Sequence, residues 1–209
     1  MDKNKRKLTE KERKRKDCFE KLSSEMQQKG YKIKNIIINA QQEKYSGLLI
    51  MLPFMALAFW IYYTVNGFDL DCISWGFVVA VPLLILCLIV LHELIHGIIW
   101  SFFAKNHFHS IDFGIIWNSF TPYCTCSEPL KKWQYLLGTA MPTLVLGGGA
   151  AVAGVMKNQL LLFFLAEYMM LAGGGDFQII LKSMLYHTDK QECVYCDHPY
   201  ECGFVIFEK

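Results

Sequence analysis

The middle of the sequence has very few ionisable side chains. No Lys or Arg occurs between Lys44 and Lys105, and residues 47–65 carry no charge at all. Residues 75–104 contain no ionisable group other than the thiol of Cys87 and one short motif. With 53% hydrophobic residues over 209 positions, this composition excludes an ordinary soluble domain.

Four apolar segments predict four membrane-spanning helices, because about 20 apolar residues cross the hydrocarbon core of a bilayer. These segments are residues 47–65, 75–104, 135–156 and 160–181. The third is rich in Gly and Ala, which permit close helix packing. Residues 157–159 leave room only for a tight hairpin between the third and fourth helices.

The segment before the first span predicts a helix. Thr9 and Glu12 fit a capping box, so we expect a charged helix over residues 9–29. Residues 31–39 are β-branched and partly alternating, which fits either a strand or, as we prefer, an ordering segment next to the membrane. The division expected is a basic amino-terminal segment (1–45), a four-span core (46–181) and a polar carboxy-terminal tail (182–209).

Two β-prone runs, residues 111–117 and 120–126, predict a hairpin around Asn118 and Ser119. An edge strand there could hold an extended substrate by β-augmentation; the alternative is a loop that plugs the bundle. The fold class predicted is thus an all-α membrane protein, a four-span helical bundle with a small cytosolic β-hairpin and a basic amino-terminal helix.

The positive charge is distributed asymmetrically. Residues 1–16 carry nine Lys or Arg and three acids, a net charge of +6 in a chain of net +2. Nucleic-acid binding is one reading of such an arm, but next to a membrane span it more simply sets orientation and contacts anionic lipid. The Lys-free loop 66–74 is expected to face outward. We therefore predict a multi-pass cell-membrane protein with both termini cytosolic, reduced cytosolic cysteines, the lipid bilayer as a partner and no nucleic acid.

The short motif in residues 75–104 is His92-Glu93-Leu94-Ile95-His96, which reads H-E-x-x-H. On a helix the two imidazoles share one face, as two nitrogen ligands of a tetrahedral zinc require. Glu93 can then act as general base towards a metal-activated water. Such groups at membrane depth cost about 2.5–3.5 kcal/mol each on insertion scales, so they usually mark function.

Asp176 is the predicted third zinc ligand. The second and fourth spans run in the same direction, and Asp176 lies 16 residues into the fourth, whereas His92 lies 17 residues into the second. At 1.5 Å per residue the two are at similar depth, about 24–26 Å from the outer face. The preceding glycines (173–175) can unwind or let helices approach. Glu167 is the competitor, but it lies about 13 Å nearer the outside, where we expect it to pair with another polar group.

These residues resemble motifs of known peptidases. His92-Glu93-Leu94-Ile95-His96-Gly97 and Gly174-Gly175-Asp176 are similar to the zinc motifs of site-2 proteases, in which the later motif usually reads Leu-Asp-Gly. A closer likeness, over about residues 30–209, is to a small bacterial family of putative zincin peptidases. It rests on the zinc motif, Glu128-Pro129-Leu130, Pro142, the Gly-Asp of the fourth span, and Asp197-His198-Pro199 with Gly203-Phe204. The resemblance implies peptidase activity without identifying a substrate.

The function predicted is therefore that of a membrane zinc metalloendopeptidase of the H-E-x-x-H type, with Glu93 catalytic and His92, His96 and Asp176 holding Zn²⁺. Its substrate would be a membrane protein or peptide. The alternative is a non-catalytic membrane zinc-binding sensor or scaffold, which has no need of Glu93. A third hypothesis is a zinc hydrolase acting on lipid or a prenylated peptide.

Two further groups of candidate ligands are weaker. His107 and His109 lie about 16–20 Å beyond His96 if the helix continues, so we expect them in a loop. Cys193-x-x-Cys196 with His198 and Cys202, joined by Cys124-x-Cys126, could form a second zinc site, but a single Cys-x-x-Cys is weak support. Reduced free thiols are the expectation here.

Overall fold

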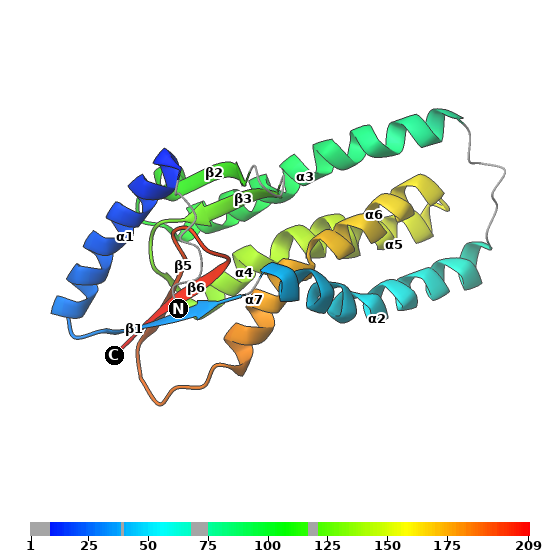
Figure 1. The fold of residues 1–209 in the computed structure, drawn as a ribbon. Coiled ribbons are helices and arrows are strands. Elements are labelled where there is room, and N and C mark those ends of the chain that lie inside the picture. Colours follow the sequence, from blue (N-terminus) through cyan, green and yellow to red (C-terminus); the bar gives the residue numbers. More distant parts are fainter. Residues whose placement is uncertain (1–8, 39, 68–74, 117–120) are drawn as a thin grey trace.

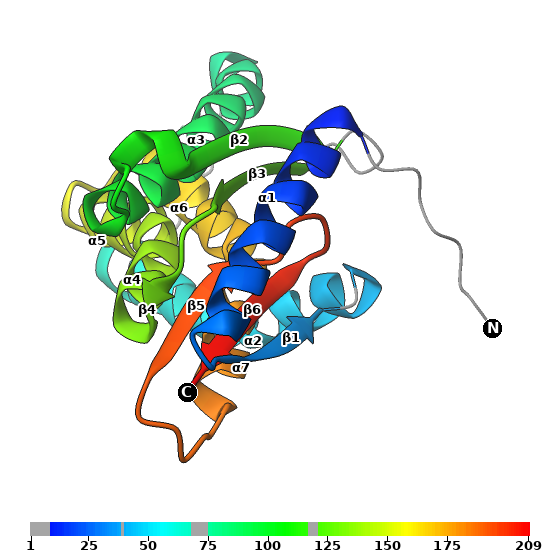
Figure 2. The same ribbon diagram turned by 90° about the vertical axis from the view of Figure 1, so that its left-hand side faces the viewer.

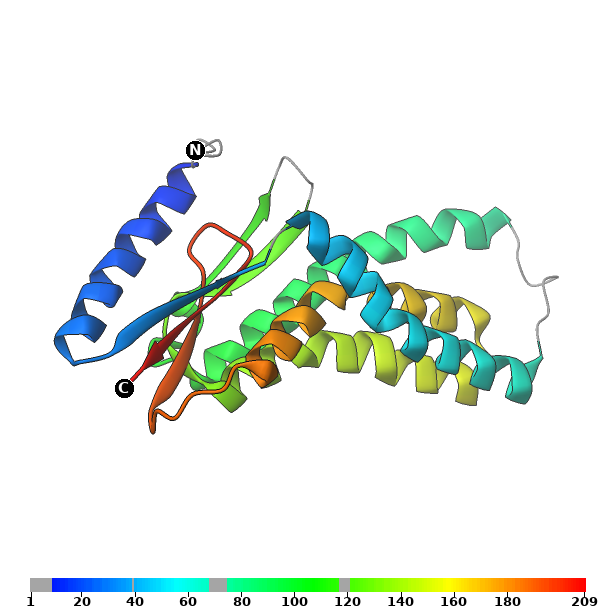
Figure 3. The same ribbon diagram turned by 60° about the horizontal axis from the view of Figure 1, so that its bottom comes forward.

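The computed structural model describes residues 9–38, 40–67, 75–116 and 121–209. Helices lie side by side in one half of the molecule, and two small antiparallel sheets with helix α1 cover one end of them (Figures 1 and 3). The helices are α1 (Glu10–Gln28), α2 (Ala40–Asn66), α3 (Trp75–Phe103), the 3-10 helix η1 (His107–Ser110), α4 (Lys132–Pro142), the π-helix η2 (Thr143–Gly149), α5 (Ala150–Met156), α6 (Leu160–Ala172) and α7 (Gly174–Leu185). The strands are β1 (Lys32–Ile37), β2 (Ile111–Ile116), β3 (Thr121–Cys126), β4 (Leu130–Lys131), β5 (Cys193–Asp197) and β6 (Gly203–Glu208).

Helical segments within the described residues match the predicted spans. Three are long and apolar enough to cross a membrane: Tyr45–Asn66, Trp75–Phe103 and Lys132–Met156. The pair α6 and α7 passes the same test only if it is taken as one span, because the two helices meet at an angle of 45°. The helices therefore allow three or four spans by length and composition.

The expected fourth span is broken at Gly173. A Cβ atom at Gly173 would overlap the hydroxyl of Thr143, so a side chain cannot be accommodated there. At the next position, a Cβ on Gly174 would lie 3.0 Å from the Cα of Gly47 in α2. The glycines thus allow both the bend and the close approach of α7 to α2.

The third span is also irregular. Pro142 ends α4, and the next seven residues, Thr143–Gly149, form a π-helix before α5 begins. A proline removes one backbone donor from the helix and crowds the preceding turn. A wider π turn is one way in which a helix accommodates such a defect.

The expected polar tail is instead half of a sheet. Strands β5 and β6 lie in a four-stranded antiparallel sheet of order β1-β6-β5-β4, with Lys32 opposite Glu208 and Ile37 opposite Gly203. The sequence interpretation was wrong here, and the preferred interpretation of residues 31–39 as a non-strand segment was wrong with it. The strands are short, and β1 pairs with residues about 170 positions later, so local patterns carry little signal. All three segments of the predicted division contribute a strand, and that division stays a prediction.

The two faces of this sheet are both covered. Tyr195, Phe204 and Ile206 pack towards the helices, against Trp100 and Tyr135. The intervening residues of β6, Val205 and Phe207, pack against Met26 of α1. Figure 2 shows this helix lying across the sheet. Successive side chains of a strand point to opposite faces, so β6 serves two cores and all five of its residues 203–207 are buried.

Two local predictions are confirmed. The side chain of Thr9 accepts a hydrogen bond from the backbone N–H of Glu12, and the Thr9 N–H donates to the Glu12 carboxylate at 2.8 Å, which completes the capping box of α1. The hairpin exists as β2 and β3, with Ile111 opposite Cys126 and Ile116 opposite Thr121. Its predicted turn at Asn118 and Ser119 lies outside the described residues.

Candidate metal centre

The two histidines of the H-E-x-x-H motif lie one helical turn apart on α3. Both are buried, with exposed fractions of 6% for His92 and 4% for His96. Their Nε2 atoms are 3.2 Å apart. This is the arrangement that a four-residue spacing on an α-helix produces.

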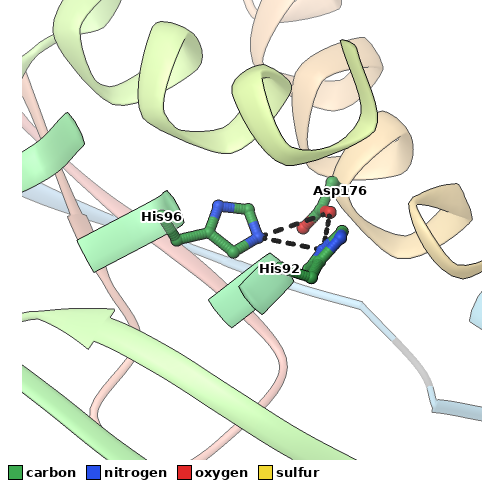
Figure 4. Close-up of side chains that lie close together, drawn as sticks. All are labelled: His92, His96 and Asp176. Carbon is green, nitrogen blue, oxygen red and sulfur yellow. Dashed lines mark hydrogen bonds and ion pairs between the residues drawn. The ribbon is translucent and has the colours of Figure 1, made fainter. Parts of the chain in front are cut away.

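Asp176 joins the two histidines from a different part of the chain. It lies in the first turn of α7, directly after the bend that follows α6. Its Oδ2 atom is 3.1 Å from His92 Nε2 and 3.5 Å from His96 Nε2 (Figure 4). The bend at Gly173 therefore brings a carboxylate from the end of the fourth apolar segment to the histidines of the second.

Hydrogen bonding orients His96 towards this group. Its Nδ1–H donates to the carbonyl oxygen of Gly138 in α4 at 2.8 Å. The lone pair of the imidazole then resides on Nε2, the atom that faces His92 and Asp176. The Nδ1 atom of His92 is buried and has no hydrogen-bond partner among the described residues.

The three side chains fit a zinc ion. Their ligand atoms all lie within 4.8 Å of one another. Zinc ligands at about 2.0–2.1 Å in a tetrahedron are separated by about 3.3 Å, and the observed separations are 3.1, 3.2 and 3.5 Å. Two imidazole nitrogens so close together repel each other when both carry lone pairs, unless a proton or a cation lies between them. Two His and one carboxylate are a donor set of catalytic zinc sites, which leave one position open.

A comparison with protein families shows the family to which the chain belongs. The family model described as "Putative zincin peptidase" matches residues 85–191, just over half of the chain. The chain belongs to the putative zincin peptidase family. The curated proteins and the solved structures contain no match to it. The matched segment contains His92, Glu93, His96 and Asp176, and the likeness to site-2 proteases stays a prediction.

Glu93 lies at the wall of a large cavity. The cavity has a volume of about 660 Å³ and is also lined by the three candidate ligands. The carboxylate of Glu93 faces the backbone N–H of Cys124, which belongs to β3. A carboxylate held at the edge of a water-accessible space next to a metal site is positioned to accept a proton from water.

The ring of a candidate metal ligand, His96, is stacked on that of Trp100. The ring of Trp100 lies against His96, with centroids 5.2 Å apart and an interplanar angle of 17°. Trp100 Nε1–H donates to the carbonyl oxygen of Tyr135 at 3.1 Å, and a Cβ on Gly138 would overlap the Trp100 ring. Gly138 thus admits Trp100 beside His96 while its own carbonyl fixes the His96 ring. The sequence alone did not predict this support.

The amino-terminal helix reaches the same cavity. Glu12 and Arg15 of α1 line it. The guanidinium of Arg15 lies 4.5 Å above the Tyr123 ring, and its Nη1–H donates to Thr125 Oγ1 at 3.4 Å. The role of residues 1–16 in setting orientation and contacting lipid stays a prediction. Arg15, near the end of this arm, also contacts the β2–β3 hairpin.

The competing carboxylate lies elsewhere. Glu167 is in α6 and does not belong to the group formed by His92, His96 and Asp176. Its Oε1 atom is buried without a hydrogen-bond partner among the described residues, so the expectation that it pairs with another polar group was wrong. His107 and His109 lie in η1 rather than in an irregular loop, and His107 Nδ1 is 3.1 Å from the carbonyl oxygen of Ser101.

The cysteine-rich segment does not assemble a second metal centre within the described parts of the chain. The group formed by His92, His96 and Asp176 is the one set of three such side chains found there. Cys124, Cys126, Cys193, Cys196 and Cys202 are all free thiols. Burial raises the pKa of the Cys126 thiol to about 12, and that of Cys196 lies well above the usual value for the same reason. Cys126 and Cys196 therefore stay protonated and pack as small apolar side chains.

Proposed function

We propose that the protein is a multi-pass membrane zinc metalloendopeptidase that hydrolyses peptide bonds of a membrane-associated protein or peptide. One observation carries the proposal: the Nε2 atoms of His92 and His96 and the Oδ2 atom of Asp176 converge beside Glu93 at a cavity. Membership of the putative zincin peptidase family supports zinc as the metal and peptide hydrolysis as the reaction.

His92, His96 and Asp176 would hold the zinc ion. When bound, zinc polarises the scissile carbonyl and lowers the pKa of water from about 15.7 towards about 7. Asp176 contributes a negative charge that offsets part of the ion's charge in an apolar environment. The hydrogen bond from His96 to Gly138 keeps the ring in one orientation, as partners of metal-bound histidines commonly do.

Glu93 would act as the general base. Its carboxylate takes a proton from the attacking water and later gives that proton to the leaving amine. The Cys124 N–H beside it restrains the carboxylate on the cavity side of α3. This role distinguishes an enzyme from a scaffold, because a site that only binds zinc does not need a carboxylate at this position.

Strand β3 is the proposed substrate-binding edge. It pairs with β2 along one edge only, and residues 121–125 line the cavity that contains Glu93. An extended peptide can add to such an edge through main-chain hydrogen bonds. This proposal favours the β-augmentation reading of the hairpin over that of a plug.

The helices support a membrane setting for the reaction. Exposed apolar side chains cover α2 and α3, as is expected of helices that face lipid. The Lys residues outside the spans favour a cytosolic position for the sheets and both termini. The site would then lie near the cytosolic end of the bundle, within reach of a substrate segment that leaves the bilayer.

Membrane proteomics tests this proposal. Cells that express the wild-type chain are compared with cells that express Glu93→Gln. A membrane protein that accumulates uncleaved on Glu93→Gln, and is processed by the wild type, is the expected result. If both strains have the same processed proteins, the zinc-binding sensor or scaffold becomes the better account.

A further inference from the structure

Asp197 is a carboxylate near the catalytic cavity that belongs neither to the metal centre nor to the segment matched by the family model. It is the last residue of β5. Its Oδ1 atom accepts a hydrogen bond from the hydroxyl of Tyr135 at 2.7 Å, and its Oδ2 atom accepts one from the backbone N–H of Cys126 at 2.9 Å. One side chain of the carboxy-terminal sheet therefore connects α4 with the end of β3.

The bond to Cys126 determines how much of the β3 edge is open. The N–H of Ser127 donates to Ser110 on the β2 side, so in an antiparallel pair the backbone groups of Cys126 point away from β2. There its N–H is taken by Asp197, and its carbonyl oxygen faces the Cys196 thiol at 3.5 Å. The outer edge of β3 is thus closed at Cys126.

The same alternation identifies the part of the edge that remains. The backbone of Cys124 also points outward, and its N–H faces Glu93. Pro122 follows at the next outward position and has no N–H. The backbone groups of Cys126 already have partners. The outer edge of β3 can therefore bind a peptide mainly through the carbonyl oxygens of Cys124 and Pro122, which lie beside the proposed general base.

The bond to Tyr135 connects Asp197 to the metal centre. The Tyr135 ring is stacked on Trp100, with centroids 5.8 Å apart and an interplanar angle of 10°. Trp100 is stacked in turn on His96. Two aromatic rings therefore separate Asp197 from the metal ligand His96, whereas its bond to the Cys126 N–H in β3 is direct.

We propose that Asp197 is a positioning residue of the peptidase site, which holds the open edge of β3 in register with Glu93. The inference rests on the proposed function, because a strand edge beside Glu93 matters only if a peptide binds there. Removing the carboxylate leaves the Cys126 N–H and the Tyr135 hydroxyl without their acceptor. Hydrogen bonds to charged groups are stronger than those between neutral groups, so we expect the end of β3 to open about 10-fold more often without them.

The test uses the full-length, zinc-loaded protein in detergent micelles. The variants are Asp197→Ala, which removes the acceptor, and Asp197→Asn, which keeps an acceptor oxygen. Asp197→Leu replaces Asp197→Ala if the latter does not fold, because it fills the volume without an acceptor. The matched control is Tyr186→Phe, which removes a 2.9 Å hydrogen bond to Glu208 in the same sheet without touching β3.

Three measurements are made on each variant: zinc per chain, hydrogen exchange of residues 121–126, and cleavage of a mixture of quenched fluorogenic peptides. For Asp197→Ala we expect wild-type zinc content, exchange about 10-fold faster or more, and KM raised about 10-fold with a smaller change in kcat. Asp197→Asn should stay within about 3-fold of the wild type because its amide oxygen can still accept a bond. Tyr186→Phe should leave the exchange of β3 unchanged.

The contradicting results separate the two proposals. If the wild type cleaves peptides while Asp197→Ala has the exchange of Tyr186→Phe and an unchanged KM, the role of Asp197 is wrong and the peptidase stands. Loss of zinc from Asp197→Ala would also overturn the proposed positioning role of Asp197, because the residue would then act on the metal centre and not on β3. A zinc-loaded wild type that cleaves none of the peptides overturns the peptidase and, with it, this role.

Discussion

His96 Nδ1–H donates to the carbonyl oxygen of Gly138 across the contact between α3 and α4. The bond selects the ring nitrogen that remains for a metal, and it depends on a residue that has no side chain. The Trp100 ring occupies the space where a Cβ on Gly138 would lie. One glycine thus supports His96 in two ways, through its carbonyl and through the indole that it admits.

Gly138→Ala should weaken zinc binding. The added methyl group must displace Trp100, which moves the stack on His96 and disturbs the carbonyl contact. Loss of such outer contacts typically lowers metal affinity about 10- to 100-fold. Gly148→Ala in the same span is the control, since a Cβ there meets nothing within 4 Å. Competition with a chelator measures both affinities, and equal values for the two variants would contradict the proposed support.

Asp176→Asn and Glu167→Gln separate the two candidate carboxylates. Asp176→Asn keeps the shape of the side chain but removes its charge, so it should reduce zinc affinity and turnover. Glu167→Gln should have little effect on either, because Glu167 lies outside the group of converging ligand atoms. Metal content per purified chain is the measurement. Normal zinc content in Asp176→Asn together with loss of zinc from Glu167→Gln would show that Glu167, and not Asp176, is the third ligand.

Asp197 should make stability depend on pH. Burial raises the pKa of its carboxyl to about 6, from 3.8. A raised pKa means that the folded protein holds the proton more tightly than the unfolded chain. The resulting stabilisation is therefore complete below about pH 4 and is lost as the pH rises through about 6, a change of about 3 kcal/mol.

This dependence is measured as a difference between the wild type and Asp197→Asn, so that other titrating groups cancel. The stability of the wild type relative to the variant should fall between about pH 4 and pH 6.5 and then level off. Thermal unfolding in detergent at a series of pH values gives the comparison. A difference that is constant over this range would show that Asp197 is not buried as described.

The proposed orientation can be checked by thiol labelling in cells. Cys18 is exposed on α1 and should be cytosolic, whereas Cys72, in the predicted outward loop, lies outside the described residues. A membrane-impermeant maleimide should label Cys72 in intact cells and Cys18 only after permeabilisation. The reverse pattern would mean that the Lys and Arg distribution has been misread.

The sequence predicted the parts of the molecule that depend on local pattern. The spacing of His92 and His96, the apolar length of three of the four predicted spans and the capping box at Thr9 follow from helix geometry, and each is present. Similar depth along straight helices also favoured Asp176 over Glu167 as the third ligand. Residues 160–181 are bent by 45° at Gly173 rather than straight, yet Asp176 still lies beside the histidines.

The parts that were missed depend on contacts between distant segments. Residues 203–208 look like the end of a polar tail until β1 and β5 flank them and α1 covers them. Arg15 looks like one charge in a basic arm, and only the hairpin gives it Tyr123 and Thr125 as partners. Asp197 likewise gains its partners only from β3 and α4. Such pairings have no periodic signature in the sequence.

The central claim is that a zinc ion held by His92, His96 and Asp176 works with Glu93 as the general base. The most direct measurement is zinc content and peptide cleavage in one preparation of Glu93→Gln, beside His92→Ala and the wild type. We predict that Glu93→Gln retains about one zinc per chain while cleavage falls by about 10²–10⁴-fold, and that His92→Ala loses both. Wild-type cleavage by Glu93→Gln would contradict the account.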